Sequence, residues 1–83
     1  MTIYNMLETV RNRMAMRDAR EALEGIGVSI YKEKGTTKAS VSVLEDLSNK
    51  WESLTDKQKQ DISIAIAGRY HVSRFVSMMN NWK

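Results

Sequence analysis

The sequence has no cysteine and no proline, and its 83 residues include only four glycines and one histidine. Without cysteine the chain can form neither a disulfide nor a thiolate metal site. Nothing therefore argues for an oxidising compartment, and the cytoplasm is the default location. Because proline is absent and glycine is rare, we expect long regular elements with breaks at the glycines.

Long apolar runs are also missing. The longest are only a few residues, as at positions 64–67, whereas a membrane-spanning helix needs about 20. Residues 1–5 lack the basic and apolar blocks of a secretory signal. We therefore expect no membrane span and no export route in this sequence.

The formal net charge of +3 is spread along the chain. The arginines at positions 11–20 are balanced by acidic residues within positions 8–24. The surplus comes from two stretches, with Lys32, Lys34 and Lys38 in the first and Arg69, Arg74 and Lys83 in the second. Phosphate binding favours a contiguous basic stripe. We therefore expect DNA binding to be weak, sensitive to salt and indifferent to sequence.

Chemistry-bearing residues are few. The sole histidine, His71, falls within a predicted helix, and neither a zinc-ligand spacing nor an acidic calcium loop is present. Gly25 and Gly27 do not make a dinucleotide-binding fingerprint, because no strand precedes them and the third glycine is missing. We predict no catalytic residue, no cofactor-binding residue and no metal ligand.

The first part of the chain predicts a helix followed by a hairpin. Apolar residues recur at helical spacing from Ile3 to Met14, and the pattern, although it drifts, indicates one helix over residues 3–23. Gly25-Ile26-Gly27 should end this helix with a left-handed cap. Residues 28–31 favour extended structure, 32–35 a turn, and Thr36 and Thr37 a returning strand.

The rest of the chain predicts three further helices. Ser42 and Glu45 have capping-box spacing, with Ser40 as a competing cap, so the second helix should begin near Ser42. Thr55 and Gln58 predict another capping box before a third helix over residues 56–67, which Gly68 stops or bends. The last helix should run from about residue 69. The predicted fold class is mainly α, a small bundle of about four helices with a short β-hairpin between the first two.

The helical stripes predict both a core and a contact surface. The expected core joins the apolar faces of three successive helices, at Leu44, Leu47, Trp51, Leu54, Ile62, Ile66, Phe75 and Val76. Near the end of the chain, Met78, Met79 and Trp82 supply more apolar surface than a small domain can readily cover. We expect these three to contact a partner and to permit weak self-association. Because the chain stops just after Trp82, we also expect residues 1–83 to be a single domain excerpted from a longer protein.

From Leu23 onward, the order of short pieces resembles a segment of bacteriophage tail tape-measure proteins. The pieces are LEGIGVSIY at 23–31, VLEDLSNKW at 43–51, LTD at 54–56, IAIAG at 64–68, RF at 74–75 and MMNNW at 78–82. The sequence departs from the family pattern after Gly68, where Arg69, Tyr70 and His71 stand in a stretch that is usually small and polar.

The resemblance implies a structural role. Tape-measure proteins are long, largely helical chains that set tail length during assembly, fill the tail tube and leave it as DNA is delivered. It thus implies a non-enzymatic module whose partners are other tail proteins or the rest of the parent chain, located in the host cytoplasm and then in the virion tail. The alternative is a small nucleic-acid-binding domain, with a helix-turn-helix-like pair around Gly68.

Overall fold

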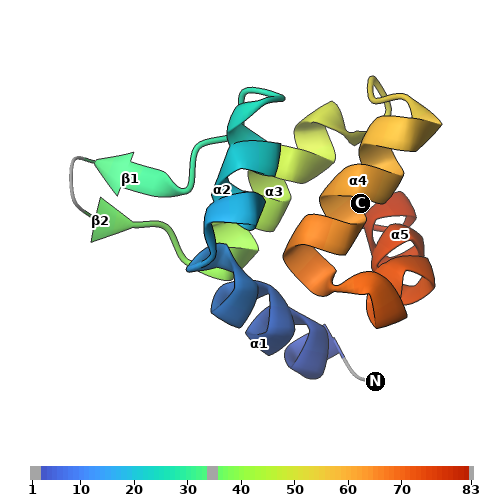
Figure 1. The fold of residues 1–83 in the computed structure, drawn as a ribbon, viewed down its shortest axis with the longest axis horizontal. Coiled ribbons are helices and arrows are strands. Elements are labelled where there is room, and N and C mark those ends of the chain that lie inside the picture. The colour runs from blue at the N-terminus through green and yellow to red at the C-terminus, as the bar shows by residue number, and fades with distance from the viewer. Residues whose placement is uncertain (1–2, 34–35, 83) are drawn as a thin grey trace.

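The computed structural model describes residues 3–33 and 36–82, which form five α-helices, one 3-10 turn and a two-stranded sheet (Figure 1). The elements are α1 (Ile3–Met14), α2 (Arg17–Glu24), β1 (Tyr31–Glu33), β2 (Thr36–Thr37), α3 (Ser40–Trp51), α4 (Asp56–Ala67), η1 (Arg69–His71) and α5 (Val72–Asn80). The predicted mainly helical domain with a short hairpin is confirmed. The predicted count of about four helices is wrong, because the first helix is two.

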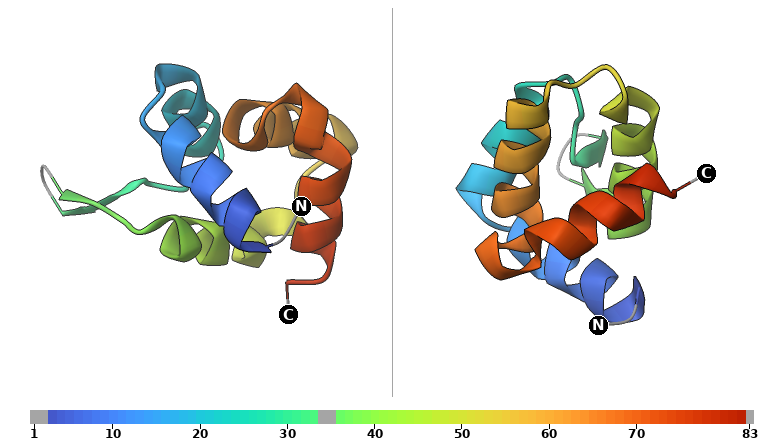
Figure 2. Two further views of the ribbon diagram at one scale, coloured as in Figure 1. Left: turned by 90° about the horizontal axis from the view of Figure 1, so that it is seen from below. Right: turned by 90° about the vertical axis from the view of Figure 1, so that its right-hand side faces the viewer.

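Helix α4 lies against α1, α2 and α5, and α3 packs on α1 and α5 (Figure 2). The hairpin extends away from the helices in both views that show it from the side. The core consequently forms between helices, while the sheet contributes little to it.

The helix predicted over residues 3–23 breaks after Met14, although no glycine or proline stands there. Ala19 follows Val10 by nine positions, so a straight helix turning about 100° per residue would place them on opposite sides. Both side chains are nevertheless fully buried in one core. The break lets the second apolar stripe turn toward the same core, and tertiary packing therefore overrides the helical propensity of this stretch.

Met16 occupies the N-cap of α2 with extended backbone (φ −86°, ψ 144°) and makes no side-chain capping bond. We expect Met16→Asp to stabilise the protein by about 1 kcal/mol, because a carboxylate at this position can accept from free amides of the first turn. The side chain is 46% exposed, so little packing is lost. Urea denaturation of Met16→Asp beside Met16→Ala is the measurement. A loss of stability in Met16→Asp alone would indicate that the helix continues through this residue in solution.

Helix α2 ends in a Schellman motif. Gly27 has φ +83°, the Val28 N–H donates to the Leu23 carbonyl at 2.9 Å, and the Gly27 N–H donates to the Glu24 carbonyl at 3.0 Å. Leu23 and Val28, which flank the motif, are both buried. The predicted left-handed cap is confirmed at Gly27, whereas Gly25 keeps helical geometry (φ −61°).

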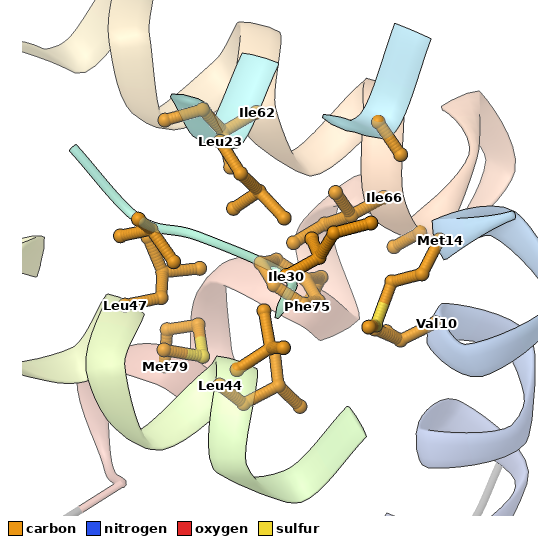
Figure 3. Close-up of a cluster of buried hydrophobic side chains, with 14 of the residues drawn as sticks. Val10, Met14, Leu23, Ile30, Leu44, Leu47, Ile62, Ile66, Phe75 and Met79 are labelled. Atoms are coloured by element: carbon orange, nitrogen blue, oxygen red, sulfur yellow. The ribbon is translucent and has the colours of Figure 1, made fainter. Parts of the chain in front are cut away.

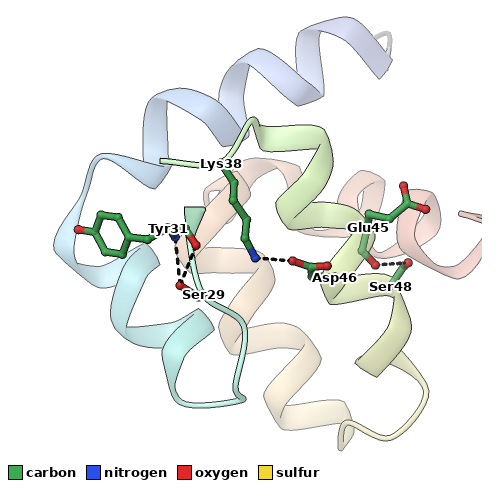
Figure 4. A network of polar contacts seen from close by, with 6 residues as sticks. All are labelled: Ser29, Tyr31, Lys38, Glu45, Asp46 and Ser48. Carbon is green, nitrogen blue, oxygen red and sulfur yellow. Dashed lines mark hydrogen bonds and ion pairs between the residues drawn. The ribbon is translucent and has the colours of Figure 1, made fainter. Parts of the chain in front are cut away.

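The hairpin is antiparallel, with Tyr31 opposite Thr37 and an irregular register before Glu33. Extended pairing begins only at Tyr31, because Val28 and Ile30 are buried in the core before the strand starts. Lys34 and Gly35, which belong to the predicted turn, lie outside the described residues. Lys83, the last residue of the sequence, lies outside them as well. Polar contacts fix the base of the hairpin. The Tyr31 N–H donates to Ser29 Oγ at 3.1 Å (Figure 4).

The capping box predicted at Ser42 is wrong. Helix α3 begins at Ser40 with Ala39 as its N-cap, and no side chain caps it. The reason lies in the chain leaving the hairpin. The Lys38 N–H donates to the Ile30 carbonyl at 2.7 Å, and its ammonium reaches Asp46 at 2.6 Å (Figure 4). These contacts fix the backbone just before Ala39, so the N-cap position falls on Ala39, ahead of either candidate serine.

The capping box predicted before α4 is confirmed. Thr55 Oγ1 accepts from the Gln58 N–H at 3.1 Å, and Gln58 Oε1 accepts from the Thr55 N–H at 2.9 Å. Gly68 ends the helix with φ +90° and ψ 153°, a conformation that is essentially restricted to glycine. The chain then turns through η1 into α5.

One continuous core joins all five helices and the segment before β1 (Figure 3). Its buried apolar residues are Met6, Val10, Met14, Ala19, Leu23, Val28, Ile30, Val43, Leu44, Leu47, Trp51, Ile62, Ile66, Ala67, Phe75 and Met79. Ser63 is also buried, and its hydroxyl donates to the Lys59 carbonyl.

Candidate functional site

The best-defined side-chain junction lies at Trp51, where α3, α4 and α5 meet. The ring is 2% exposed and lies edge-on to Phe75, with centroids 6.1 Å apart and planes at 73°. Its Nε1–H donates to Asn80 Oδ1 at 2.8 Å, and the Lys59 ammonium lies 5.5 Å from its ring centroid. The indole therefore has both an edge contact and a satisfied N–H.

The residues predicted as core fall into two groups. Leu44, Leu47, Trp51, Ile62, Ile66 and Phe75 are buried, whereas Leu54 and Val76 are partly buried at the edge of the core. The prediction omitted the contribution of α1, α2 and the segment before β1. The signal for α1 was present, since Met6, Val10 and Met14 repeat every four residues. The sequence around Val28 and Ile30 contained no such signal, because a short apolar run does not indicate which of its residues will be buried.

The predicted partner contact at Met78, Met79 and Trp82 is divided by the structure. Met79 is 3% exposed and belongs to the core, so its assignment to an outer contact surface is wrong. It follows Phe75 by four residues on the inner face of α5. Met78 and Trp82 are partly buried and pack against the core from outside. The remaining candidate contact surface is therefore these two side chains.

Other large apolar side chains project into solvent. Tyr70 is 94% exposed and Tyr4 is 79% exposed, while Met16, Tyr31 and Val41 are less so. Tyr31 has a polar partner, since its hydroxyl accepts from Arg20 Nη1 at 3.1 Å. Tyr70 stands out because it lies in the short η1 turn between two helices.

Arg13 connects α1 to the end of α4. Its Nε donates to the Ala65 carbonyl at 3.1 Å and its Nη2 to the Ile64 carbonyl at 3.4 Å. A Cβ placed on Gly68 would lie 3.6 Å from Arg13 Nη1, so the guanidinium lies directly beside this glycine. A cation at a helix C-terminus interacts favourably with the helix dipole, and Arg13 therefore stabilises this end of α4.

A cleft of about 380 Å³ opens beside this contact, between α1 and the turn that follows α4. Its lining contains two arginines, the histidine and an exposed tyrosine, and no carboxylate. The residues are Thr9, Asn12, Arg13, Ala67, Gly68, Arg69, Tyr70 and His71.

Helices α4 and α5, joined through Gly68 and η1, are packed on each other as the helix-turn-helix alternative requires. The side chains of α5 are less suited to reading DNA bases. Asn80 accepts from Trp51, and Asn81 Nδ2 donates to the Ser77 carbonyl at 2.8 Å. Arg74 is exposed on this helix and Arg69 precedes it, so the pair presents two basic side chains and no array for base readout.

Other polar contacts lie at the surface. In the described ranges 3–33 and 36–82, no three or more His, Asp or Glu side chains come together as metal ligands would. The hydrogen bond from Lys57 to Asp61, 2.8 Å long, raises the pKa of that exposed lysine. Within the same ranges, no helix has the length and apolar character needed to cross a membrane.

No protein-family model matches the chain, and no solved structure gives a significant match to it. The fold and the site therefore define the protein as a small, mainly helical domain with a short two-stranded antiparallel sheet.

Proposed function

We propose that this chain is a non-enzymatic structural module of a bacteriophage tail tape-measure protein, contributing to tail assembly and tail-length determination. The observation that carries the proposal is the position of the residues that resemble tape-measure proteins. These residues form the Schellman motif at Leu23 and Gly27, the Trp51 junction, the Thr55 cap and the Gly68 turn. Each has a function in the fold.

The polar groups of the same segment support a structural role. Asn80 satisfies the buried indole of Trp51, and Asn81 donates to the helix that carries it. An active site would instead direct such groups toward a common cavity. These amides are engaged in holding helices, which is what a module without chemistry requires.

The proposed partners are other tail proteins or the rest of the parent chain, in the host cytoplasm during assembly and later in the virion tail. Met78 and Trp82 are the surface we assign to such contacts. Both pack on the core yet keep part of their apolar area exposed, and apolar surface of this kind commonly marks an interface. The same two side chains would support weak self-association.

Tail length provides the test. In a phage whose tape-measure gene encodes this chain, a second in-frame copy of residues 1–83 is expected to lengthen the tail. The upper limit is about 120 Å for a fully helical insertion at about 1.5 Å per residue. Electron microscopy of purified particles gives the length, and mass spectrometry shows whether the chain is present. Particles that lack the chain, or tails of unchanged length that contain both copies, would contradict the proposal.

The contact surface is tested in the same phage. Trp82→Ala is expected to reduce the yield of full-length tails, because it removes apolar area from the proposed interface. Tyr4→Ala is the matched control, since it removes an exposed aromatic from α1. Equal yields from the two variants would remove Trp82 from the interface and leave the tail-length test unaffected.

A further inference from the structure

Basic side chains without a carboxylate partner meet in the cleft between α1 and the turn after α4. No aspartate or glutamate occurs in residues 62–82. Among the described residues, neither Arg13 nor Arg69 forms an ion pair with a carboxylate. Two other surface clefts contain acidic side chains, Glu8 in one and Glu21 with Glu24 in the other. Of these three clefts, the cleft at Gly68 is the one suited to an anion.

Arg13 prepares this cleft for an anion in two ways. Its bonds to the Ile64 and Ala65 carbonyls cover the negative end of the α4 dipole, which would otherwise repel a negative ligand. Those bonds use Nε and Nη2, while Nη1 lies beside Gly68, which also lines the cleft. Because the guanidinium is already held in place, a ligand loses little side-chain entropy on binding to it.

Tyr70 indicates the chemical class of the anionic ligand. Its ring is 94% exposed and lies between Arg69 and His71 in the sequence of η1. An aromatic ring beside cationic groups is the combination by which proteins bind single-stranded nucleic acid, with bases stacked on the ring and phosphates on the cations. Thr9 and Asn12 add hydrogen-bonding groups on the opposite wall.

We propose that the cleft formed by Arg13, Arg69, Tyr70 and His71 binds single-stranded nucleic acid without sequence preference. A phosphate lies against Arg13 and Arg69, and an unpaired base stacks on Tyr70. This goes beyond a structural role in the tail. It also differs from a helix-turn-helix contact, because the exposed face of α5 takes no part in it.

Fluorescence anisotropy with a labelled oligothymidylate strand, over a range of salt concentrations, tests the site. Tyr70→Ala is expected to weaken binding about tenfold with an unchanged salt dependence, because stacking is not ionic. Tyr70→Phe should retain binding. Arg69→Ala should lower the magnitude of the slope of log K against log salt by about 0.7, the value for one phosphate of a single strand.

Arg17→Ala is the matched charge control. Arg17 is exposed and pairs with Glu21 at 2.8 Å in a different cleft, so its removal should leave both affinity and slope nearly unchanged. Arg69 and Tyr70 are exposed, so their variants should keep the wild-type thermal midpoint. The site is refuted by an absence of binding at low salt, an equal effect of Arg17→Ala and Arg69→Ala, or an inert Tyr70→Ala. Tighter binding of the corresponding duplex would also refute it and favour the helix-turn-helix alternative.

Discussion

Trp51→Ala is expected to lower the free energy of unfolding by about 3 to 5 kcal/mol, the range typical of a buried large aromatic truncated to alanine. The substitution removes the edge contact with Phe75 and opens a cavity where three helices meet. It also leaves Asn80 without its indole donor. Because the total stability of small domains is only about 5 to 15 kcal/mol, thermal unfolding should shift strongly or the variant should fail to fold.

Milder variants separate the parts of this effect. Trp51→Phe keeps most of the apolar volume and loses the hydrogen bond, so it should be much less destabilising than Trp51→Ala. Asn80→Ala should have a small effect, because Asn80 is exposed and water can reach the site. Lys59 is partly buried, and Lys59→Ala should cost about 0.5 to 2 kcal/mol, the range of cation–π contacts between exposed and desolvated sites. An unchanged unfolding midpoint in Trp51→Ala would contradict the core assignment.

Gly68→Ala is expected to destabilise the protein by about 1 to 3 kcal/mol through backbone strain. The residue has φ +90° and ψ 153°, which an alanine rarely adopts. Space is not the obstacle, since a Cβ would meet its nearest Arg13 atoms at 3.6 to 3.9 Å, an ordinary contact distance. The cost should therefore appear as a lower urea midpoint with an unchanged slope.

Gly25→Ala is the control for Gly68→Ala. Gly25 has helical geometry (φ −61°), so alanine gains helix propensity there, although its Cβ would approach the Glu21 carbonyl at 3.3 Å. We expect a change close to zero. Equal destabilisation by the two substitutions would show that loss of glycine at these helix ends, and not the special conformation of Gly68, determines stability.

Local signals were reliable where a short stretch of chain contains its own partners and no distant contact competes with them. The capping box of Thr55 and Gln58 and the left-handed glycine at position 27 depend on residues within one turn. The inner stripe of α3, with Leu44, Leu47 and Trp51, also follows from helical periodicity alone. These features could be predicted because their geometry depends little on the rest of the molecule.

The failed predictions share a different cause. Met14 to Arg17 contains no helix breaker, and Ser42 with Glu45 has a good capping pattern, yet α1 ends at Met14 and α3 begins at Ser40. In the first case, burying Ala19 in the core that holds Val10 requires a change of direction. In the second, the bonds of Lys38 to Ile30 and Asp46 fix the backbone earlier than the serines can. Such preferences of about 1 kcal/mol are easily overcome by tertiary contacts.

The sequence by itself determined the helical class, most of the inner stripes, two helix ends and the scarcity of catalytic groups. Only the tertiary structure decided that Met79 lies inside, that α4 contacts three other helices, and that Arg13 lies beside Gly68. Arg13 and Ala65 are separated by 52 positions, and no periodicity along the chain indicates that they touch. The basic cleft could not be predicted for the same reason, because its two walls come from opposite parts of the chain and meet only when α1 packs on α4.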